Sequence, residues 1–492
     1  MLAAAGLPAP AGLPPRFEGL TADSRAVGPG MLYAALPGVR ADGRDFIGEA
    51  VARGAAAVLA PLGTVWPAGV PPRPLILDAE PRRALARLAA AFAGPQPGTV
   101  VAVTGTNGKT SVAEFMRQMF VLSGRRAASL GTLGVVGPDG VGTPKFATPG
   151  LTTPDPVALA EILAGLARDG VEDVAIEASS HGLDQYRLDG VRLAAGGFTN
   201  LTRDHLDYHG DMAGYRAAKL RLFAELLPEG APVVASAGLE AETLEALRGI
   251  AVRRRLKLQV VGAEARAVAG GQVLRVGGRE VVLRLPGRFQ AENAVLAAAL
   301  AEAAGVVDAL ALLPLLVGVR GRLELAAEVD GWAAYVDFAH TPDALERLLT
   351  ALRAHTSGRL VLVFGAGGDR DAGKRPLMGA VAARLADVVI VTDDNPRGEA
   401  PGAIRAAIAC EGGIEIGDRE RAIATALGML RAGDVLAVAG KGHESGQTVG
   451  GVTTAFDDVA VVRRLVGAGG AAAAGTRTPA LSAALSKRGR EI

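Results

Sequence analysis

A short glycine-rich segment carries the clearest chemistry in this sequence. Residues 100–104 are a short apolar run, and they lead directly into Gly105-Thr106-Asn107-Gly108-Lys109-Thr110-Ser111. Backbone N–H groups at such a turn favour anionic oxygens, and glycines let the backbone approach them. Lys109 can reach a β- or γ-phosphate, and the Thr110 hydroxyl can sit on Mg²⁺. The segment predicts a site for a nucleoside triphosphate, although two residues rather than the usual four separate its glycines.

Two further polar segments follow apolar runs. The first begins with the Glu177 carboxylate, which suits Mg²⁺ because this cation prefers oxygen ligands; a helix cap at Ser179 or Ser180 is the alternative. The second places two Asp and two His within six residues, namely Asp204, His205, Asp207 and His209. Such clusters are typical of metal or phosphate chemistry. We favour Mg²⁺ over zinc, because no third His or Cys stands at a zinc-ligand spacing.

Four polar loops in the last third of the chain also follow predicted strands. They are 337–343, 365–371, 393–397 and 440–444. Arg370 and Arg397 supply guanidinium groups for planar carboxylates, and Glu444 supplies a carboxylate for an ammonium group. A zwitterionic amino acid requires both charges. Any single loop could be an ordinary surface loop, but four at successive strand ends indicate a binding site.

Parallel strands would bring these segments to common sheet edges, where ligands bind in α/β proteins. We expect strands at 31–36, 56–60 and 74–77 with helices at 46–54 and 81–93, then a linker at 94–98. Strands at 100–104, 174–177 and 194–199 have the spacing of a mostly parallel sheet covered by helices. The next set is 333–338, 360–364, 388–392 and 435–439. The sequence therefore predicts an α/β protein with domains at 1–95, 98–323 and 324–466 and a disordered tail at 467–492.

Composition narrows the class of protein. The chain has 492 residues, with 52 Lys and Arg against 51 Asp and Glu, so no overall charge attracts it to nucleic acid or a membrane. The single cysteine, Cys410, excludes a disulfide framework and fits a cytoplasmic protein. The apolar stretch 294–319 is interrupted by Glu302, Asp308 and Pro314, so we expect a buried helix pair rather than a membrane span.

Taken together, these motifs resemble those of the Mur ligases, from about residue 23 to residue 465. The segments that carry the resemblance are 104–110, 177–183, 199–210, 337–343 and 394–397. The resemblance implies an N-terminal UDP-sugar domain, a central P-loop ATPase domain and a C-terminal Rossmann-like domain. Within the family, the motifs are similar to those of enzymes that add the third residue of the peptidoglycan stem peptide. Such an enzyme phosphorylates UDP-MurNAc-L-Ala-D-Glu with ATP, and an amino group then attacks the acyl phosphate.

The resemblance also assigns roles to residues. ATP would be held by residues 105–111 together with Asn293, Arg322, Asp337 and His340, and Lys109, Lys219 and His205 would be catalytic. One or two Mg²⁺ would be bound by Thr110, Glu177, His205 and Lys219, the last as N6-carboxylysine. The UDP-sugar dipeptide would contact Ser24, Val39, Arg40, Ala41, Thr152, Thr153, Ser179, Gln185 and Arg187. Leu151 and Gln290 depart from the family pattern, which usually has Asn at both positions.

The incoming amino acid would contact Arg370, Asp394, Asn395, Pro396, Arg397, Gly440 and Glu444. The Asp-Asn-Pro-Arg sequence is typical of enzymes that use meso-diaminopimelate, with L-lysine and L-ornithine as alternatives. A folylpolyglutamate synthetase-like ligase and an ATP-driven switch or transport NTPase are the other hypotheses. The polar loops of the third domain argue against an NTPase, and the first 95 residues argue against the synthetase. We expect a cytoplasmic monomer with small-molecule substrates and no nucleic-acid or membrane partner.

Overall fold

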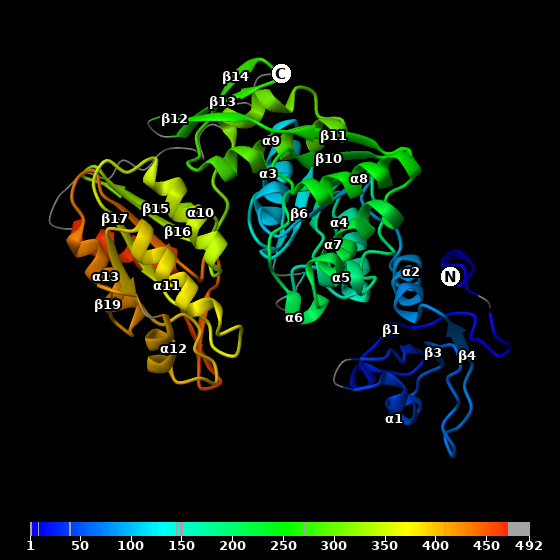
Figure 1. The fold of residues 1–492 in the computed structure, drawn as a ribbon. Helices are drawn as coiled ribbons and strands as arrows, with labels where there is room; N and C mark the ends of the chain where they lie inside the picture. Colours follow the sequence, from blue (N-terminus) through cyan, green and yellow to red (C-terminus); the bar gives the residue numbers. More distant parts are fainter. Residues whose placement is uncertain are drawn as a thin grey trace. The chain divides into compact units, whose positions relative to one another are not determined.

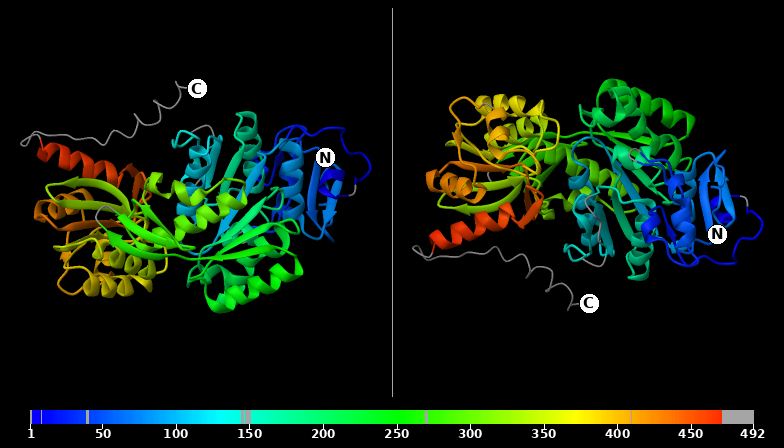
Figure 2. Two further views of the ribbon diagram at one scale, coloured as in Figure 1. Left: turned by 90° about the horizontal axis from the view of Figure 1, so that it is seen from above. Right: turned by 90° about the horizontal axis from the view of Figure 1, so that it is seen from below.

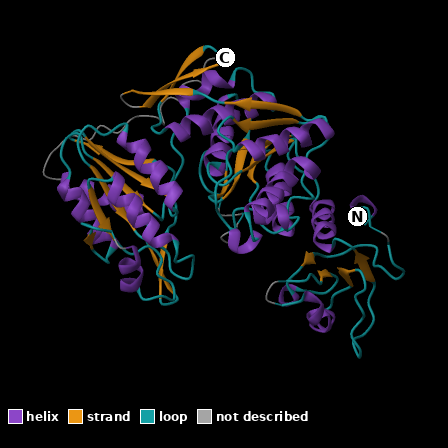
Figure 3. Cartoon of the chain, viewed as in Figure 1, coloured by secondary structure: helices purple, strands orange, loops and turns teal. Residues whose placement is uncertain are grey.

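The structure, a computed structural model, describes residues 2–7, 9–38, 41–143, 146, 151–268, 271–408 and 410–470. It has two compact units, Met1–Val319 and Arg320–Ile492, which are described separately (Figure 1). In both units helices alternate with strands along the chain and lie against the sheets (Figure 3). Most strand pairs in the larger sheets are parallel. The predicted α/β class is confirmed.

The first sheet has four short parallel strands in the order β1-β2-β3-β4. Leu32 and Ala34 of β2 pack with α2 on one face, whereas Tyr33 packs with α1 on the other. The elements are β1 (Leu20–Thr21), β2 (Leu32–Ala34), β3 (Ala57–Pro61), β4 (Leu75–Asp78), α1 (Ile47–Ala52), α2 (Pro81–Ala93) and 3₁₀ turns at Ala3–Ala5, Ser24–Ala26 and Gly43–Phe46. The two-residue β1 was not predicted, because so short a strand leaves no periodic pattern.

The second sheet has seven strands in the order β11-β10-β9-β5-β8-β6-β7, and only β7 runs antiparallel to its neighbour. Both faces of β5 are buried, since Val100 and Ala102 join one core cluster and Val101 and Val103 join another. Such strands read as continuous apolar runs. The strands are β5 (Thr99–Thr104), β6 (Ala127–Gly131), β7 (Gly134–Val136), β8 (Asp173–Glu177), β9 (Ala195–Phe198), β10 (Pro232–Ser236) and β11 (Lys257–Val261).

Helices cover both faces of this sheet. They are α3 (Lys109–Leu122), α4 (Pro156–Arg168), α5 (Ser180–Asp184), α6 (Leu206–His209), α7 (Met212–Arg221) with a π-helical turn at Leu222–Leu226, α8 (Ala241–Arg253) and α9 (Arg288–Ala303). The α9 helix packs against α3, which starts at the glycine-rich loop. Among the described residues no helix is both long enough and apolar enough to span a membrane.

Two features of the first unit differ from the expectations. Along the chain, β11 is followed by an antiparallel three-stranded sheet that precedes α9. Its strands are β12 (Glu264–Val268), β13 (Gly271–Val276) and β14 (Arg279–Leu283). The expected helix pair at 294–319 is α9 followed by a 3₁₀ helix, Ala309–Leu315. Pro314 lies inside this second element, and proline lacks the N–H that an α-helix would use.

The second unit contains a six-stranded sheet in the order β15-β16-β20-β17-β18-β19, with only β15 antiparallel. Its last helix, α14 (red in Figure 2), packs against β15 and α13. The elements are β15 (Glu324–Val329), β16 (Trp332–Asp337), α10 (Pro342–Arg353), β17 (Leu360–Phe364), α11 (Lys374–Leu385), β18 (Val388–Val391), α12 (Pro401–Ile408), β19 (Ile414–Glu415), α13 (Arg419–Met429), β20 (Val435–Ala439), the hairpin β21 (Gly446–Val449) and β22 (Val452–Ala455), and α14 (Asp458–Gly470). Most of the predicted tail, 471–492, lies outside the described residues, while 467–470 belong to α14.

Candidate active site

The glycine-rich loop connects the end of β5 to the first residue of α3, as predicted. Gly105 (φ +144°) and Gly108 (φ +86°) have backbone angles that residues with a β-carbon rarely adopt. A β-carbon on Gly105 would collide with the Thr199 hydroxyl, and one on Gly108 would collide with the Asn293 side chain. Glycine is therefore required twice, and Asn293 of α9 lies directly against the loop.

The segment after β9 fixes the shape of this loop. Asn200 receives a hydrogen bond at its side-chain oxygen from the Asn107 N–H (2.9 Å) and at its carbonyl from the Thr106 N–H (2.9 Å). Thr199 and Asn200 both donate to the Asn107 carbonyl, at 2.6 and 3.1 Å. The sequence suggested metal or phosphate chemistry for this segment, and the structure adds that it braces the loop.

Two lysines meet at the loop. Lys109 donates to the carbonyls of Gly105 (2.9 Å) and Thr106 (2.8 Å), and Lys219 of α7 donates to Gly105 (2.8 Å). Lys219 is only 1% exposed and lies over the Tyr215 ring. Burial, with a smaller effect of the Lys109 charge, lowers the pKa of Lys219 well below its ordinary value. Burial of this kind favours the neutral amine over the charged ammonium form.

Glu177 ends β8 beside β5, with Glu177 paired to Val103 in the strand register. Its carboxylate is 2% exposed and accepts hydrogen bonds from the Thr132 N–H (2.8 Å) and hydroxyl (3.2 Å). Thr110, the second residue of α3, is also buried. These oxygen donors lie at one edge of one sheet, which suits a hard cation such as Mg²⁺.

A chain of polar contacts leads away from Glu177. The Thr153 hydroxyl donates to the Glu177 carbonyl (2.8 Å) and accepts from Ser179, while Arg187 donates to the Thr153 carbonyl (2.6 Å) and to Gln185 (2.7 Å). Thr152 joins through the Thr132 hydroxyl, at 3.2 Å. The structure therefore brings together all five predicted substrate contacts of the central domain.

An aromatic cluster lies beside these contacts. His181 packs against Tyr208 (ring centroids 4.2 Å apart) and His205 (4.9 Å), and Tyr208 packs against His209 (4.8 Å). Burial lowers the pKa of His181 to about 4 and also lowers the pKa values of His205 and His209. These imidazoles are therefore neutral at physiological pH. Among the residues that the structure describes, no three His, Cys, Asp or Glu side chains converge as a metal site, so a zinc centre has no support.

The predicted contacts of the N-terminal sheet are only partly described. Ser24 is buried and its hydroxyl donates to Glu49 (2.9 Å), and the Ala41 carbonyl accepts from the Gly38 N–H (3.0 Å). Val39 and Arg40 lie outside the described residues.

The remaining predicted nucleotide contacts lie in the second unit. Asp337, the last residue of β16, is buried and accepts hydrogen bonds from the N–H groups of Leu323 (2.6 Å) and Ala339 (2.8 Å). Burial raises its pKa to about 6, against the opposing effect of Arg322. Arg322 lies over the Phe338 ring, and Nδ1 of His340 contacts the Phe338 carbonyl at 2.8 Å. Asp337, Arg322 and His340 therefore all contact the short segment Phe338-Ala339.

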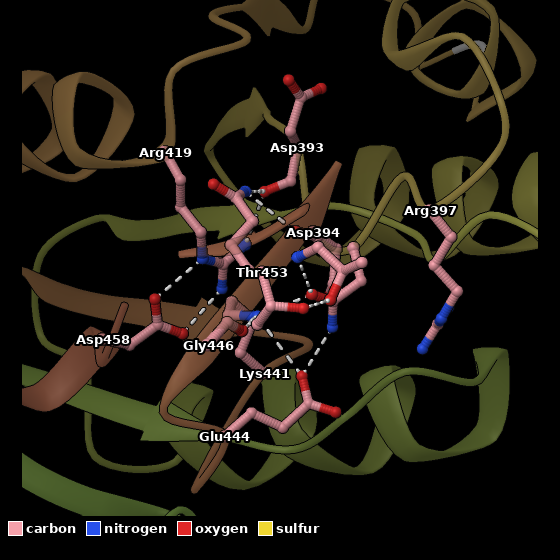
Figure 4. A network of polar contacts seen from close by, with 12 residues as sticks. Asp393, Asp394, Arg397, Arg419, Lys441, Glu444, Gly446, Thr453 and Asp458 are labelled. Carbon is pink, nitrogen blue, oxygen red and sulfur yellow. Dashed lines mark hydrogen bonds and ion pairs between the residues drawn. The ribbon is translucent and has the colours of Figure 1, made fainter. Parts of the chain in front are cut away.

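The predicted amino-acid contacts cluster at the carboxyl ends of β18 and β20 (Figure 4). Asn395 donates to the Glu444 carboxylate (2.7 Å), and Arg397 donates to the Gly368 carbonyl (2.9 Å). Gly440 (φ +115°) must lack a β-carbon because Asp394 occupies that space. Arg370 is exposed, and its side chain makes no hydrogen bond or ion pair with another described residue. The structure thus joins Asn395 to Glu444 but leaves Arg370 outside the network.

Two buried cations of this region were not predicted as site residues. Lys441 is 0% exposed and donates to Asn395, Glu444 and the Gly446 carbonyl. Arg419 is 1% exposed, pairs with Asp458 at 2.7 Å, and donates to the Ala439 carbonyl at 3.0 Å. Lys441 stood inside the Gly-Lys-Gly-His-Glu loop that the sequence did single out. Arg419 follows an ordinary helix-capping Asp, and we find no sequence signal that would have identified it.

Sequence models of one family match most of the chain. They are the Mur ligase family catalytic domain at residues 16–93, the Mur ligase middle domain at 103–301 and the Mur ligase glutamate ligase domain at 321–442. This chain belongs to the Mur ligase family. The middle-domain match contains the glycine-rich loop, Glu177, Lys219 and Asn293, which are the residues that meet at one sheet edge.

Curated Mur ligases align over nearly the whole chain. It is 54% identical to the UDP-N-acetylmuramoyl-L-alanyl-D-glutamate--2,6-diaminopimelate ligase of Caulobacter vibrioides, over 91% of this chain and 94% of that protein. The protein of the same name from Rhizobium meliloti is 51% identical over the same shares.

Solved structures agree with this assignment. A UDP-N-acetylmuramoyl-L-alanyl-D-glutamate--2,6-diaminopimelate ligase has a TM-score of 0.65 and 33% identity, covering 92% of this chain and 95% of that chain. A folylpolyglutamate synthase of Mycobacterium tuberculosis complexed with ADP has a TM-score of 0.60 at 22% identity, covering 73% of this chain and 91% of that one. This second likeness concerns the fold alone.

Proposed function

We propose that the protein is an ATP-dependent ligase that joins UDP-MurNAc-L-Ala-D-Glu to a diamino acid, meso-diaminopimelate, in peptidoglycan precursor synthesis. The names of relatives about 50% identical over nine-tenths of the chain support the two substrates. The observation that carries the proposal is the hydrogen bond from Asn395 to Glu444, together with the backbone of Thr448, which contacts both Asn395 and Arg397. These groups offer one carboxylate for an ammonium group and one guanidinium for a carboxylate.

The first step is transfer of the γ-phosphoryl group of ATP to the D-Glu carboxylate, which gives an acyl phosphate and ADP. The loop N–H groups at the start of α3 would hold the ATP phosphates, and Lys109 would offset their charge. Lys109 now bonds to two loop carbonyls, so it would exchange these for phosphate oxygens. Asn293, packed against Gly108, would keep the loop in its receptive shape.

The second step is attack of the diamino acid's amino group on the acyl carbon, after which phosphate leaves and an amide remains. Glu444 would hold an ammonium group of the amino acid, and Arg397 would bind a carboxylate. Catalysis then rests mainly on positioning and charge stabilisation, since no covalent intermediate with the protein is formed.

A magnesium ion fits the residues near the loop. Glu177 supplies a buried carboxylate, and Thr110, His205 and Lys219 would complete the set that we propose to hold one or two ions. Lys219 would contribute as N6-carboxylysine, because its neutral amine can add CO₂, and the product is an oxygen ligand. When bound, Mg²⁺ neutralises charge on the transferring phosphoryl group.

The proposal is tested by ATP-dependent phosphate release with UDP-MurNAc-L-Ala-D-Glu and, separately, meso-diaminopimelate, L-lysine or L-ornithine. We expect strong preference for meso-diaminopimelate. Preference for lysine or ornithine would keep the ligase and overturn the role of Arg397. No release with any of the three would refute the ligase assignment.

A further inference from the structure

We infer that Lys441 is a positioning residue that holds the proposed amino-acid pocket in its binding shape. This role rests on the function proposed above. Lys441 is fully buried, and its ammonium group donates to the Gly446 carbonyl (2.6 Å), the Asn395 side-chain oxygen (3.2 Å) and Oε2 of Glu444 (3.3 Å) (Figure 4). An ammonium group has three N–H donors, and all three are used. Lys441 therefore acts through its neighbours and not by touching the substrate.

The first neighbour is Asn395, whose amide orientation is fixed by donors. Its side-chain oxygen accepts from Lys441 and from the Thr448 N–H (3.0 Å), and neither of these groups can accept a hydrogen bond. The amide nitrogen must then face the other way, where it donates to Glu444 (2.7 Å). Lys441 and the Thr448 N–H thus together determine which end of Asn395 faces the carboxylate.

The second neighbour is Glu444, which is held by one of its two oxygens. The hydrogen bonds from Asn395 and Lys441 both end on Oε2, and in Figure 4 the other oxygen points away from the network. A carboxylate anchored in this way has lost its freedom to rotate but can still accept an ammonium group. This arrangement reduces the side-chain conformational entropy that Glu444 loses when an amino acid binds.

The third neighbour connects Lys441 to the opposite side of the pocket. Gly446 begins β21, the first strand of a hairpin that holds the backbone of Arg397. The Arg397 N–H donates to the Thr448 carbonyl (2.9 Å), and the Arg397 carbonyl accepts from the Gly450 N–H (2.7 Å). Arg397 has φ +52°, in the left-handed region that arginine rarely adopts. The hairpin contacts help to keep it there, so Lys441 links the proposed ammonium reader and the proposed carboxylate reader.

Replacing Lys441 with Met keeps the length of the side chain but removes one hydrogen bond from each of the three acceptors. We expect the Lys441→Met variant to have a KM for meso-diaminopimelate raised about 10- to 100-fold, the range for lost hydrogen bonds to charged groups. The KM values for ATP and UDP-MurNAc-L-Ala-D-Glu should stay within about twofold, because Lys441 contacts neither predicted site. Lys257→Met, at an exposed lysine of β11, is the matched control and should leave all three KM values unchanged.

A double-mutant cycle separates positioning from general damage. If Lys441 acts through Glu444, the loss in Lys441→Met/Glu444→Gln should be far smaller than the product of the two single losses. Losses that multiply, or an equal rise in all three KM values, would overturn the inference. Thermal melting identifies a variant that fails to fold. In that case Lys441→Gln, which retains two donors, replaces it and should give a smaller rise in the same KM alone.

Different results would refute the ligase function and the positioning role of Lys441. A wild-type protein that is inactive with all three diamino acids would refute the proposed function. An active wild-type protein whose Lys441→Met and Lys441→Gln variants retain the wild-type KM for meso-diaminopimelate would refute the role of Lys441 alone.

Discussion

Lys109 and Lys219 donate hydrogen bonds to the same acceptor, the Gly105 carbonyl, at 2.9 and 2.8 Å. Two cations at one carbonyl repel each other, and in this pair Lys219 is the deeply buried member. Both burial and the charge of Lys109 lower the pKa of Lys219. Of the two lysines, Lys219 is therefore the one whose neutral form is favoured.

The first prediction concerns this neutral amine. Only an unprotonated lysine adds CO₂, and the lowered pKa of Lys219 increases the fraction of that form near neutral pH relative to an ordinary lysine, whose pKa is about 10.4. Protein equilibrated with ¹³C-bicarbonate at pH 7.5 should therefore show a carbamate signal by NMR. Lys219→Met should lose the signal and at least about 100-fold in activity, because the proposed Mg²⁺ site would lose this oxygen ligand.

Lys257→Met is the control for the carbamate signal, because Lys257 is an exposed lysine of β11. The signal should persist in this variant. A Lys219→Met protein with wild-type activity, or with an undiminished carbamate signal, would contradict the assignment.

The second prediction compares two glycines at opposite ends of α3. Gly108 (φ +86°) and Gly124 (φ +87°) have nearly the same backbone angle, but only at Gly108 would a β-carbon collide, with Asn293. Each substitution by Ala should lower the free energy of unfolding by about 1–2 kcal/mol through backbone strain. Only Gly108→Ala should also raise the KM for ATP, by at least about tenfold, because the loop must move. Equal KM values in the two variants would show that the loop shape is unimportant for ATP.

The sequence predicted where the site lies better than it predicted which side chains contact one another within the site. Glu177 and Thr199 were expected at one edge because each follows an apolar run, and the strand register places them beside the glycine-rich loop. The sheet of β12, β13 and β14 was missed, although Gly277-Gly278 between two β-rich runs is a hairpin signal. The charged, half-exposed residues of these strands obscured the pattern.

What the sequence could not supply was the partner of each polar side chain. Asn395, Lys441 and Glu444 were visible as members of two loops about 50 residues apart. Whether Lys441 faces solvent or the protein interior depends on how the two loops pack, and no local pattern encodes this. Arg370 and Arg397 looked equivalent for the same reason, yet within the described part of the chain only Arg397 is held by neighbouring groups.

The third prediction is a pH dependence that arises from His443. Burial, together with Arg322, Arg320 and His340, lowers its pKa to about 3. The unfolded chain therefore binds one more proton than the folded chain between about pH 3 and 6.5. The contribution of His443 to the free energy of unfolding is fully present above pH 6.5. It is lost as the pH falls, by at most about 1.4 kcal/mol per pH unit.

His443→Phe removes this titration and keeps a ring against Phe338, whose centroid lies 4.9 Å away. The chain has two tryptophans, so in a Trp66→Phe background the fluorescence of Trp332 reports on the second unit alone. Between pH 7.5 and 5.5, the urea midpoint of unfolding should fall further in the Trp66→Phe protein, which retains His443, than in the Trp66→Phe/His443→Phe protein. Equal falls would mean that His443 titrates normally.

The last prediction tests which arginine reads the distal carboxylate of the diamino acid. Arg397 is anchored through its backbone to β21 and the hairpin turn and through Nη1 to Gly368, whereas Arg370 is exposed. Lysine keeps the charge but cannot form the bidentate contact of a guanidinium group. Arg397→Lys should therefore raise the KM for meso-diaminopimelate about 10- to 100-fold and leave that for L-lysine, which lacks the second carboxylate, almost unchanged.

Arg370→Lys provides the matched comparison, because the same chemical change is made at the exposed arginine. If it raises the KM for meso-diaminopimelate while Arg397→Lys does not, the reader is Arg370, and binding must draw that side chain into the pocket. If both variants raise it, the two guanidinium groups share the substrate's carboxylates. An effect confined to Arg397→Lys is the outcome expected from the contacts that hold Arg397 in its left-handed backbone conformation beside Gly368.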